Sequence, residues 1–131
     1  MYEQFLAPQN LVAVVGVSSD PKKYGSRVYR TLKDYGVKVV AVNPKYTELY
    51  GDKIFPDLAS LPQKPDVVNI IVPPAVTEEI VKQAKGLGIT KVWMQPGAES
   101  AAAIKFSREN GIECVSSACI IIDGLHKSFL Y

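Results

Sequence analysis

The stretch from Leu11 to Gly36 constrains the fold most, because it joins an apolar run, a loop of small and basic residues and a helical pattern. The run Leu11–Val15 is rich in β-branched residues, which is typical of a buried strand. After Gly25, apolar residues recur at helical spacing, and Gly36 is expected to end the helix. A strand, a loop and a helix in this order present free backbone N–H groups and the positive end of the helix dipole to the loop. The stretch therefore predicts a site for a phosphate-bearing ligand.

The same alternation of apolar runs and helical segments continues along the chain. Continuous apolar strands separated by helices indicate a parallel sheet with helices on both faces. Right-handed crossovers then give an α/β, doubly wound, Rossmann-like parallel sheet with the expected strand order 3-2-1-4-5. The length of 131 residues predicts a single domain over residues 1–131. Further strands are expected at residues 38–42, 53–55, 66–72, 91–94 and 112–115, and helices are expected with Thr77 as an N-cap and from about Glu99.

Composition and charge argue against several classes of function. The net charge of +2 is too small to suggest a nucleic-acid partner, and no nucleic-acid motif is visible. No window is long and apolar enough for a membrane span, and the start lacks the pattern of a signal peptide, so we expect a cytoplasmic protein. Cys114 and Cys119 do not make a disulfide framework, and with His126 as the single histidine we expect no metal site.

Four segments are expected to meet at one edge of the predicted sheet. In a doubly wound sheet, ligands bind outside the carboxyl ends of the strands, where the strand order reverses. Each of the four segments directly follows a predicted strand, so all of them would face the same crevice. They span residues 16–27, 43–45, 72–74 and 95–97.

The glycine spacing and the second strand end narrow the choice of phosphate ligand. The dinucleotide fingerprint needs three closely spaced glycines and an acidic residue about twenty positions later. Here Gly16 is followed by no glycine before Gly25, and the second strand ends in Asn43, Pro44 and Lys45, without a carboxylate. A lysine at that place suits a ribose that carries its own phosphate. Plain NAD is therefore disfavoured, while NADP and a 3′-phosphorylated nucleotide stay open.

Four motifs in order resemble those of small single-domain CoA-binding proteins. The chain is similar to the CoA-binding amino-terminal domain of the succinyl-CoA synthetase α subunit, from about Leu11 to Cys119. The synthetase reaction also uses a phosphorylated histidine from a second domain, which has no counterpart here. The resemblance therefore implies CoA binding without a ligase reaction by this chain alone. The motifs are Gly16-Val-Ser-Ser-Asp-Pro with Gly25-Ser-Arg, then Val42-Asn-Pro-Lys45, Asp66 with Ile71-Val-Pro-Pro74, and Val92-Trp-Met-Gln-Pro-Gly97.

The resemblance also implies a set of residues that bind the cofactor, coenzyme A. The first loop and the start of the next helix would contact the CoA phosphates, and Lys45 would lie near the nucleotide end. The segment 72–74 would border the ligand, and Gln95 would lie near the pantetheine path. The complete set is Gly16, Ser18, Ser19, Lys23, Gly25, Ser26, Arg27, Asn43, Pro44, Lys45, Val72, Pro73, Pro74 and Gln95.

Structural roles compete with several of these assignments. Ser18 and Ser19 could be turn residues, because hydroxyls often bond their own backbone. Arg27 could be a solvated helix residue. Cys119 is either a small core residue or a thiol near the CoA sulfur that forms a mixed disulfide with it. Trp93 and Met94 are expected in the core.

The preferred function is a non-catalytic CoA or acyl-CoA carrier, sensor or accessory subunit, with no catalytic residue assigned. An NADP-binding redox enzyme or sensor module is the alternative, because it would use the same loop and the same basic residue. The apolar segment 120–131 either completes the core of the monomer or packs on a partner subunit or a second copy.

Overall fold

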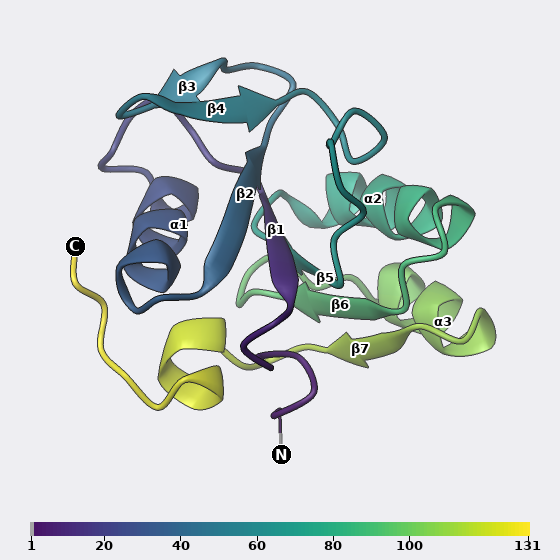
Figure 1. Cartoon of the computed structure of the whole chain (residues 1–131). Coiled ribbons are helices and arrows are strands. Elements are labelled where there is room, and N and C mark those ends of the chain that lie inside the picture. The colour runs from purple at the N-terminus through teal and green to yellow at the C-terminus, as the bar shows by residue number, and fades with distance from the viewer. Residues whose placement is uncertain (1) are drawn as a thin grey trace.

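A single parallel sheet organises the computed structural model, which describes residues 2–131 (Figure 1). Its central strands β1, β5 and β6 are short, mainly apolar runs whose side chains are buried on both faces, as expected of a covered parallel sheet. The strands are β1 Leu11–Val15, β2 Lys38–Val42, β3 Glu48–Leu49, β4 Asp52–Phe55, β5 Val67–Ile70, β6 Lys91–Met94 and β7 Glu113–Val115. The helices are α1 Tyr24–Asp34, α2 Pro74–Gly86, α3 Ala101–Glu109 and a π-helical turn, η1 Ile120–Gly124.

The strand order in the described chain is β3-β4-β2-β1-β5-β6-β7. The Rossmann-like α/β fold is therefore confirmed, and the predicted order 3-2-1-4-5 corresponds to β4-β2-β1-β5-β6. The observed order differs from it by one additional strand at each edge. β3 is the antiparallel member, paired with β4 through a tight turn at Tyr50 and Gly51. Both turn residues have positive φ, +49° and +83°, as a type I′ hairpin requires.

Helices cover the two faces of the sheet separately. Figure 1 shows α1 and η1 on one face, and α2 and α3 on the other. Trp93 and Met94 are neighbours on β6 and point to opposite faces, because side chains alternate along a strand. Trp93 packs in the core below α1 and η1, and Met94 in the core below α2 and α3. Both side chains are fully buried, so their predicted place in the core is confirmed.

Two predicted helix starts need correction. α2 begins at Pro74 with Pro73 as its N-cap, so the prediction that Thr77 is the N-cap is wrong. Proline is favoured at the first helical position because its missing N–H has no partner there and its φ already suits a helix. Thr77 lies inside the helix, and its hydroxyl lies 3.4 Å from the carbonyl oxygen of Pro73. α3 begins two residues later than expected, after Ser100, whose hydroxyl accepts the Ala103 N–H.

The C-terminal segment packs against the rest of the chain. Ile120 and Ile121 of η1 are fully buried in the core beside Trp93. Beyond η1 the chain runs along the outer side of α1, where the Tyr35 hydroxyl donates to the Ser128 carbonyl at 2.8 Å (Figure 1). The start of segment 120–131 thus completes the core of the monomer. Among residues 2–131, no helix is both long enough and apolar enough to cross a membrane.

Candidate functional site

The carboxyl ends of four parallel strands form one row. Val15 of β1 is in register with Val42 of β2 and with Ile70 of β5, and Ile70 is in register with Met94 of β6. The next residues continue this row. The Gly16, Ile71 and Gln95 N–H groups donate to the carbonyl oxygens of Val42, Val15 and Ile70, at 2.8, 2.9 and 3.0 Å. The topology therefore brings the four predicted segments to one edge, at the point where the chain changes from one face of the sheet to the other.

Two glycines allow the first loop and α1 to approach each other closely. Gly16 has φ +115°, a conformation that residues with a side chain rarely adopt. A methyl group on Gly25 would lie only 2.1 Å from the carbonyl oxygen of Gly16, which is far inside contact distance. Glycine is therefore required at position 25 by packing, independently of any ligand.

The three serines of the first segment use their hydroxyls within the protein. Ser26 Oγ donates to the Ser18 carbonyl at 2.7 Å and accepts the Ser18 N–H at 3.1 Å. Ser18 Oγ accepts the Asp20 N–H, and Ser19 Oγ donates to the Glu48 carbonyl at 2.6 Å. These bonds hold the loop in its shape. The serine hydroxyls thus have the structural role that was the alternative to phosphate binding for Ser18 and Ser19. Contacts of these serines with a ligand stay a prediction.

The helices that begin at this edge differ in how their first N–H groups are satisfied. The first four N–H groups of any helix lack partners within the helix. The N-cap residues of α1 and α2, Lys23 and Pro73, make no side-chain capping bond, and neither first turn holds an acidic residue. By contrast, α3 is capped by Ser100. The start of α1 therefore keeps the positive end of the helix dipole available to an anion. The start of α2 offers fewer N–H groups, because Pro73 and Pro74 have none and the Val76 N–H donates to the Pro73 carbonyl at 2.9 Å.

The predicted basic residues lie in different environments. Lys23 and Lys45 are exposed, and a turn holds Lys45 in place, because its N–H donates to Asn43 Oδ1 at 2.9 Å. Arg27 instead faces the C-terminal segment. Its Nε donates to the Tyr131 carbonyl at 2.9 Å, and its guanidinium carbon lies 5.3 Å from the centre of the Phe129 ring. The structure thus leaves the two lysines open to solvent and engages Arg27.

A cavity of about 170 Å³ opens at the row of strand ends on the side of α2. Four residues predicted to bind the cofactor line it: Gly16, Asn43, Pro44 and Val72. Its walls are mainly aliphatic, with Val76 and Ile80 contributed by α2. The remaining lining residues, which were not expected at the site from their place in the sequence, are Val15, Val42, Pro56, Asp57, Glu79 and Gln83.

Gln95 lies on the opposite, α1 side of the edge and is fully buried. Its Nε2 donates to the Tyr24 hydroxyl at 2.9 Å and lies 3.4 Å from Cys119 Sγ. Its Oε1 accepts the Ile120 N–H at 2.8 Å and the Asn69 Nδ2 at 3.1 Å. Burial raises the pKa of Tyr24 above the ordinary value of a tyrosine. Every hydrogen-bonding position of the Gln95 amide is therefore directed at a protein group.

Asn69 and Tyr24 are members of this polar cluster that were not assigned to the site from the sequence. Asn69 is buried within β5, and its Oδ1 has no hydrogen-bond partner among the described residues. An asparagine inside an apolar strand could have signalled a buried polar contact, because buried amides need partners. Its partner Gln95 is 26 positions further along the chain, so the sequence pattern gave no sign of the pairing.

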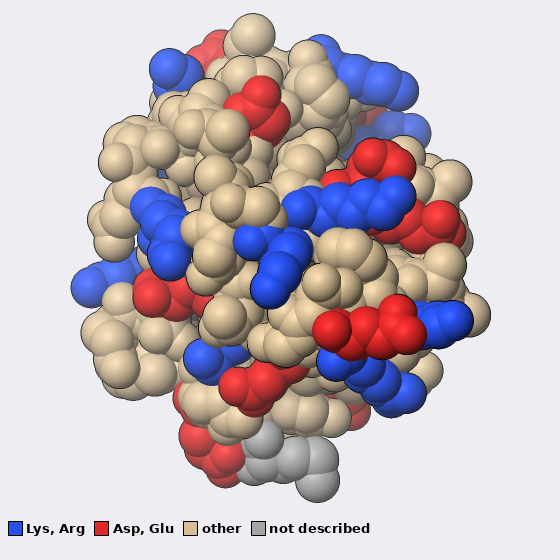
Figure 2. All heavy atoms as spheres, turned by 90° about the vertical axis from the view of Figure 1, so that its right-hand side faces the viewer, with Lys and Arg blue, Asp and Glu red and all other residues tan. Residues whose placement is uncertain are grey.

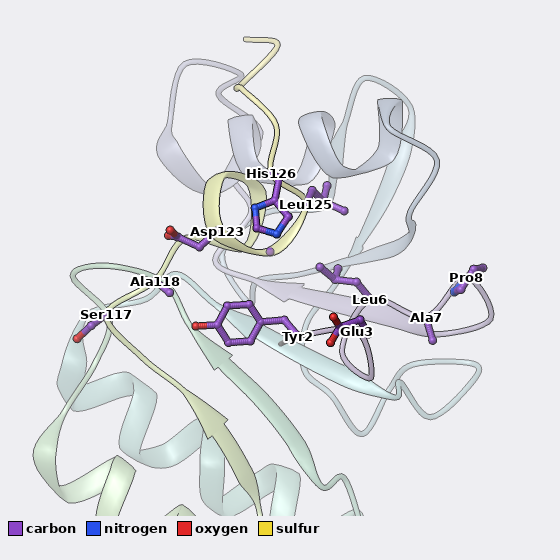
Figure 3. A pocket seen from close by; sticks show the side chains of 11 residues that line it. Tyr2, Glu3, Leu6, Ala7, Pro8, Ser117, Ala118, Asp123, Leu125 and His126 are labelled. Atoms are coloured by element: carbon purple, nitrogen blue, oxygen red, sulfur yellow. The ribbon is translucent and has the colours of Figure 1, made fainter.

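A larger cavity lies away from this edge. It has a volume of about 680 Å³, and it is lined by the residues before β1 together with the loop after β7, η1 and the residues that follow η1 (Figure 3). In this view Tyr2, Leu6 and His126 border the space, and none of the predicted binding residues belongs to its lining. A choice by cavity volume alone would therefore give a different site from the one that the strand topology indicates.

On the face that Figure 2 shows, acidic and basic side chains are interspersed and form no single basic patch.

Comparisons with known proteins point to one family. A family model described as a CoA binding domain matches residues 10–124. The chain is 28% identical to the alpha subunit of the ADP-forming acetate–CoA ligase II of Pyrococcus furiosus, over 98% of this chain and 30% of the relative. It is 26% identical to the uncharacterized protein YneT of Bacillus subtilis, over 90% of this chain and 87% of that protein.

A solved structure of a conserved hypothetical protein from Pyrococcus furiosus has the same fold. It is 37% identical, with a TM-score of 0.82, and the match covers 87% of this chain and 98% of the other. The relatives thus include proteins of similar size and much longer ligases. This chain spans less than a third of the length of the ligase relatives it matches.

Proposed function

This chain belongs to the CoA-binding domain family, and from that premise we propose that it binds coenzyme A or an acyl-CoA without catalysing a reaction by itself. The observation that carries the proposal is the cavity at the strand ends. Gly16, Asn43, Pro44 and Val72 come from three segments that are distant in the sequence, and they line one space. A crevice at the switch point of a doubly wound sheet is where such folds bind their ligands.

The proposed pose places the parts of CoA along this edge. The adenine lies in the aliphatic cavity, and the diphosphate lies at the uncapped start of α1. The ribose 3′-phosphate lies near Lys45, which is exposed and held by the Asn43 turn. The pantetheine arm follows residues 72–74 toward Gln95. This pose uses the helix dipole for the diphosphate and a point charge for the 3′-phosphate.

Calorimetry with CoA, dephospho-CoA and NADPH tests the proposal. A charge-assisted phosphate contact contributes about 1.5–3 kcal/mol, so CoA should bind roughly tenfold to a hundredfold more tightly than dephospho-CoA. In Lys45→Ala that preference should disappear, whereas Lys105→Ala on α3 should keep it. If CoA and dephospho-CoA bind the unmodified protein equally well, the role of Lys45 is wrong. If neither CoA nor dephospho-CoA binds, the proposal is refuted.

NADP is the competing ligand, because it also carries a phosphate on its ribose. The family match and the named ligase relatives favour CoA. The same titration decides the matter, since tighter binding of NADPH than of CoA would reverse the assignment.

An accessory role follows from the proposed absence of catalysis. Matched relatives are named as acetate–CoA ligases and are much longer than this chain. We therefore propose that any reaction of the bound CoA is carried out by a partner subunit. Light scattering would detect a homo-oligomer, and pull-down with CoA present would detect a partner. The cytoplasmic location stays a prediction.

Cys119 is proposed to lie near the sulfur end of the ligand. Its side chain is 6% exposed, and its Sγ faces the Gln95 amide. With the disulfide of CoA as reagent, the Cys119 thiolate would attack one sulfur, form a mixed disulfide and release one CoA thiol. Intact-mass measurement should show one CoA adduct that is absent in Cys119→Ser and present in Cys114→Ser. An unmodified native protein would refute this placement.

A further inference from the structure

We infer that Asp57 and Glu79 make the cavity at the strand ends selective for a purine that carries an amino group, adenine, over one that carries an oxo group, hypoxanthine. The inference rests on the proposed binding of CoA at this cavity. It adds a recognition of the base, which the proposed function leaves open.

The dimensions and walls of the cavity suit one flat heterocycle. Ligand pockets commonly measure about 300–1,000 Å³, so a volume of about 170 Å³ can hold only part of a ligand as large as CoA. Proline and branched aliphatic side chains provide the walls, and such surfaces pack against the faces of an aromatic ring. The walls are Val15, Val42, Pro44, Pro56, Val72, Val76 and Ile80.

Two polar side chains of the cavity, Glu79 and Gln83, lie on α2. Val76, Ile80 and Gln83 follow one another at helical spacing on the same side of α2, so the cavity extends along this helix from its start. The loop that leads from β1 to α1 (the phosphate loop) begins at Gly16, beside the chain that leads into α2, and so lies at the start of this path. Glu79 and Gln83 lie further along the path. Asp57 comes from the loop after β4 and borders the same space. A base that enters from the phosphate loop therefore turns its far edge toward these groups.

Carboxylates at this end impose a direction on the hydrogen bonds. An ionised carboxylate only accepts hydrogen bonds, and the lining contains no lysine or arginine. Asp57 is oriented by the Ser60 N–H, which donates to its Oδ1 at 2.8 Å. Glu79 lies 3.6 Å from the Lys82 ammonium on the surface of α2. The 6-amino group of adenine can donate to these oxygens, whereas the 6-oxo group of hypoxanthine is an acceptor and cannot make this hydrogen bond.

Calorimetry with CoA and with its hypoxanthine analogue tests this inference. We expect the native protein to prefer CoA by roughly tenfold, as one hydrogen bond to a partly solvated charged group would give. The double variant Asp57→Asn, Glu79→Gln offers amide donors in place of two carboxylates and should lose that preference. Glu78→Gln is the matched control, because the Glu78 carboxylate accepts the Ser100 hydroxyl at 2.7 Å and does not line the cavity.

The outcomes separate this inference from the proposed function. If the native protein binds CoA and the analogue equally, base selection is wrong while CoA binding stands. If the preference persists in the double variant, Asp57 and Glu79 are not its source. If neither ligand binds the native protein, both proposals fail. Urea unfolding of each variant confirms that the tested protein is folded, and Glu79→Gln alone provides a second test that leaves the Asp57 turn intact.

Discussion

The two ends of the proposed ligand path differ in how they are built. On the α2 side, the strand ends border an open cavity with aliphatic walls. On the α1 side, Gln95 is fully buried and bonded to Tyr24, Asn69 and Ile120. The first end is already shaped for a flat group, whereas the second must exchange protein contacts for ligand contacts. We therefore expect the nucleotide to supply most of the affinity and the pantetheine end to add little.

The largest expected effect comes from a methyl group at Gly25, where α1 packs against the loop after β1. Gly25→Ala would place Cβ 2.1 Å from the Gly16 carbonyl oxygen, so either the loop or α1 must move. We expect a loss of about 3 kcal/mol in the free energy of unfolding, together with loss of CoA binding. Urea unfolding measures the first and calorimetry the second.

Gly86→Ala is the matched control for that substitution. Gly86 is the last residue of α2, and a methyl group there meets no atom within 4 Å. It should leave stability unchanged or raise it by about 0.5–1 kcal/mol, because alanine favours a helix over glycine. Equal effects of the two substitutions would show that close packing of α1 on the loop is not required.

A smaller effect is expected on the α1 side, where the Gln95 amide is buried and fully hydrogen-bonded. Gln95→Met keeps the volume but leaves the Ile120 N–H and Asn69 Nδ2 without their acceptor. Buried unsatisfied donors cost about 1–3 kcal/mol, so we expect a loss of about 2 kcal/mol in unfolding free energy. In a Cys114→Ser background, Cys119 should also react faster with a thiol reagent. Gln83→Met, on the exposed surface of α2, is the control and should change neither quantity. If Gln95→Met has the unfolding free energy and the Cys119 reaction rate of the native protein, the hydrogen bonds of Gln95 do not stabilise this region.

The smallest effect is expected at Asp52, which lies outside both ends of the path. Lys33 holds the pKa of this carboxyl below its ordinary value, and Tyr29 also donates to it. A lowered pKa stabilises the fold above the ordinary carboxyl pKa, and the stabilisation is lost as the pH falls through the folded-state value. Because the pair is exposed to solvent, Asp52→Asn should cost only about 0.5 kcal/mol at pH 7. This difference should vanish in acid unfolding experiments, and CoA binding should not change.

The sequence predicted the parallel centre of the sheet and the edge at which the candidate site lies, but not the edge strand β3. Apolar runs and glycines identify β1, the first loop and α1, and topology alone brings Gly16, Asn43 and Val72 to one edge. The N-cap of α2 was placed four residues late, at Thr77 instead of Pro73, because threonine has a side chain that can cap a helix, whereas proline has none.

The tertiary contacts could not be predicted in the same way. The bonds of Gln95 join residues from four separate segments, and no local pattern encodes them. Arg27 looked like a phosphate ligand because it stands at the start of α1. Its engagement with Tyr131 depends on the path of the last residues, which only the folded structure reveals.

Blocking the open cavity tests the central claim most directly. Val76 borders the cavity and is 43% exposed, so Val76→Trp should fill the space without a large cost in stability. Ile122→Trp, on the exposed side of η1, is the control. Calorimetry should show CoA binding to the native protein and to Ile122→Trp, and binding at least tenfold weaker to Val76→Trp. CoA binding of native strength in Val76→Trp would contradict the claim that this cavity holds the nucleotide.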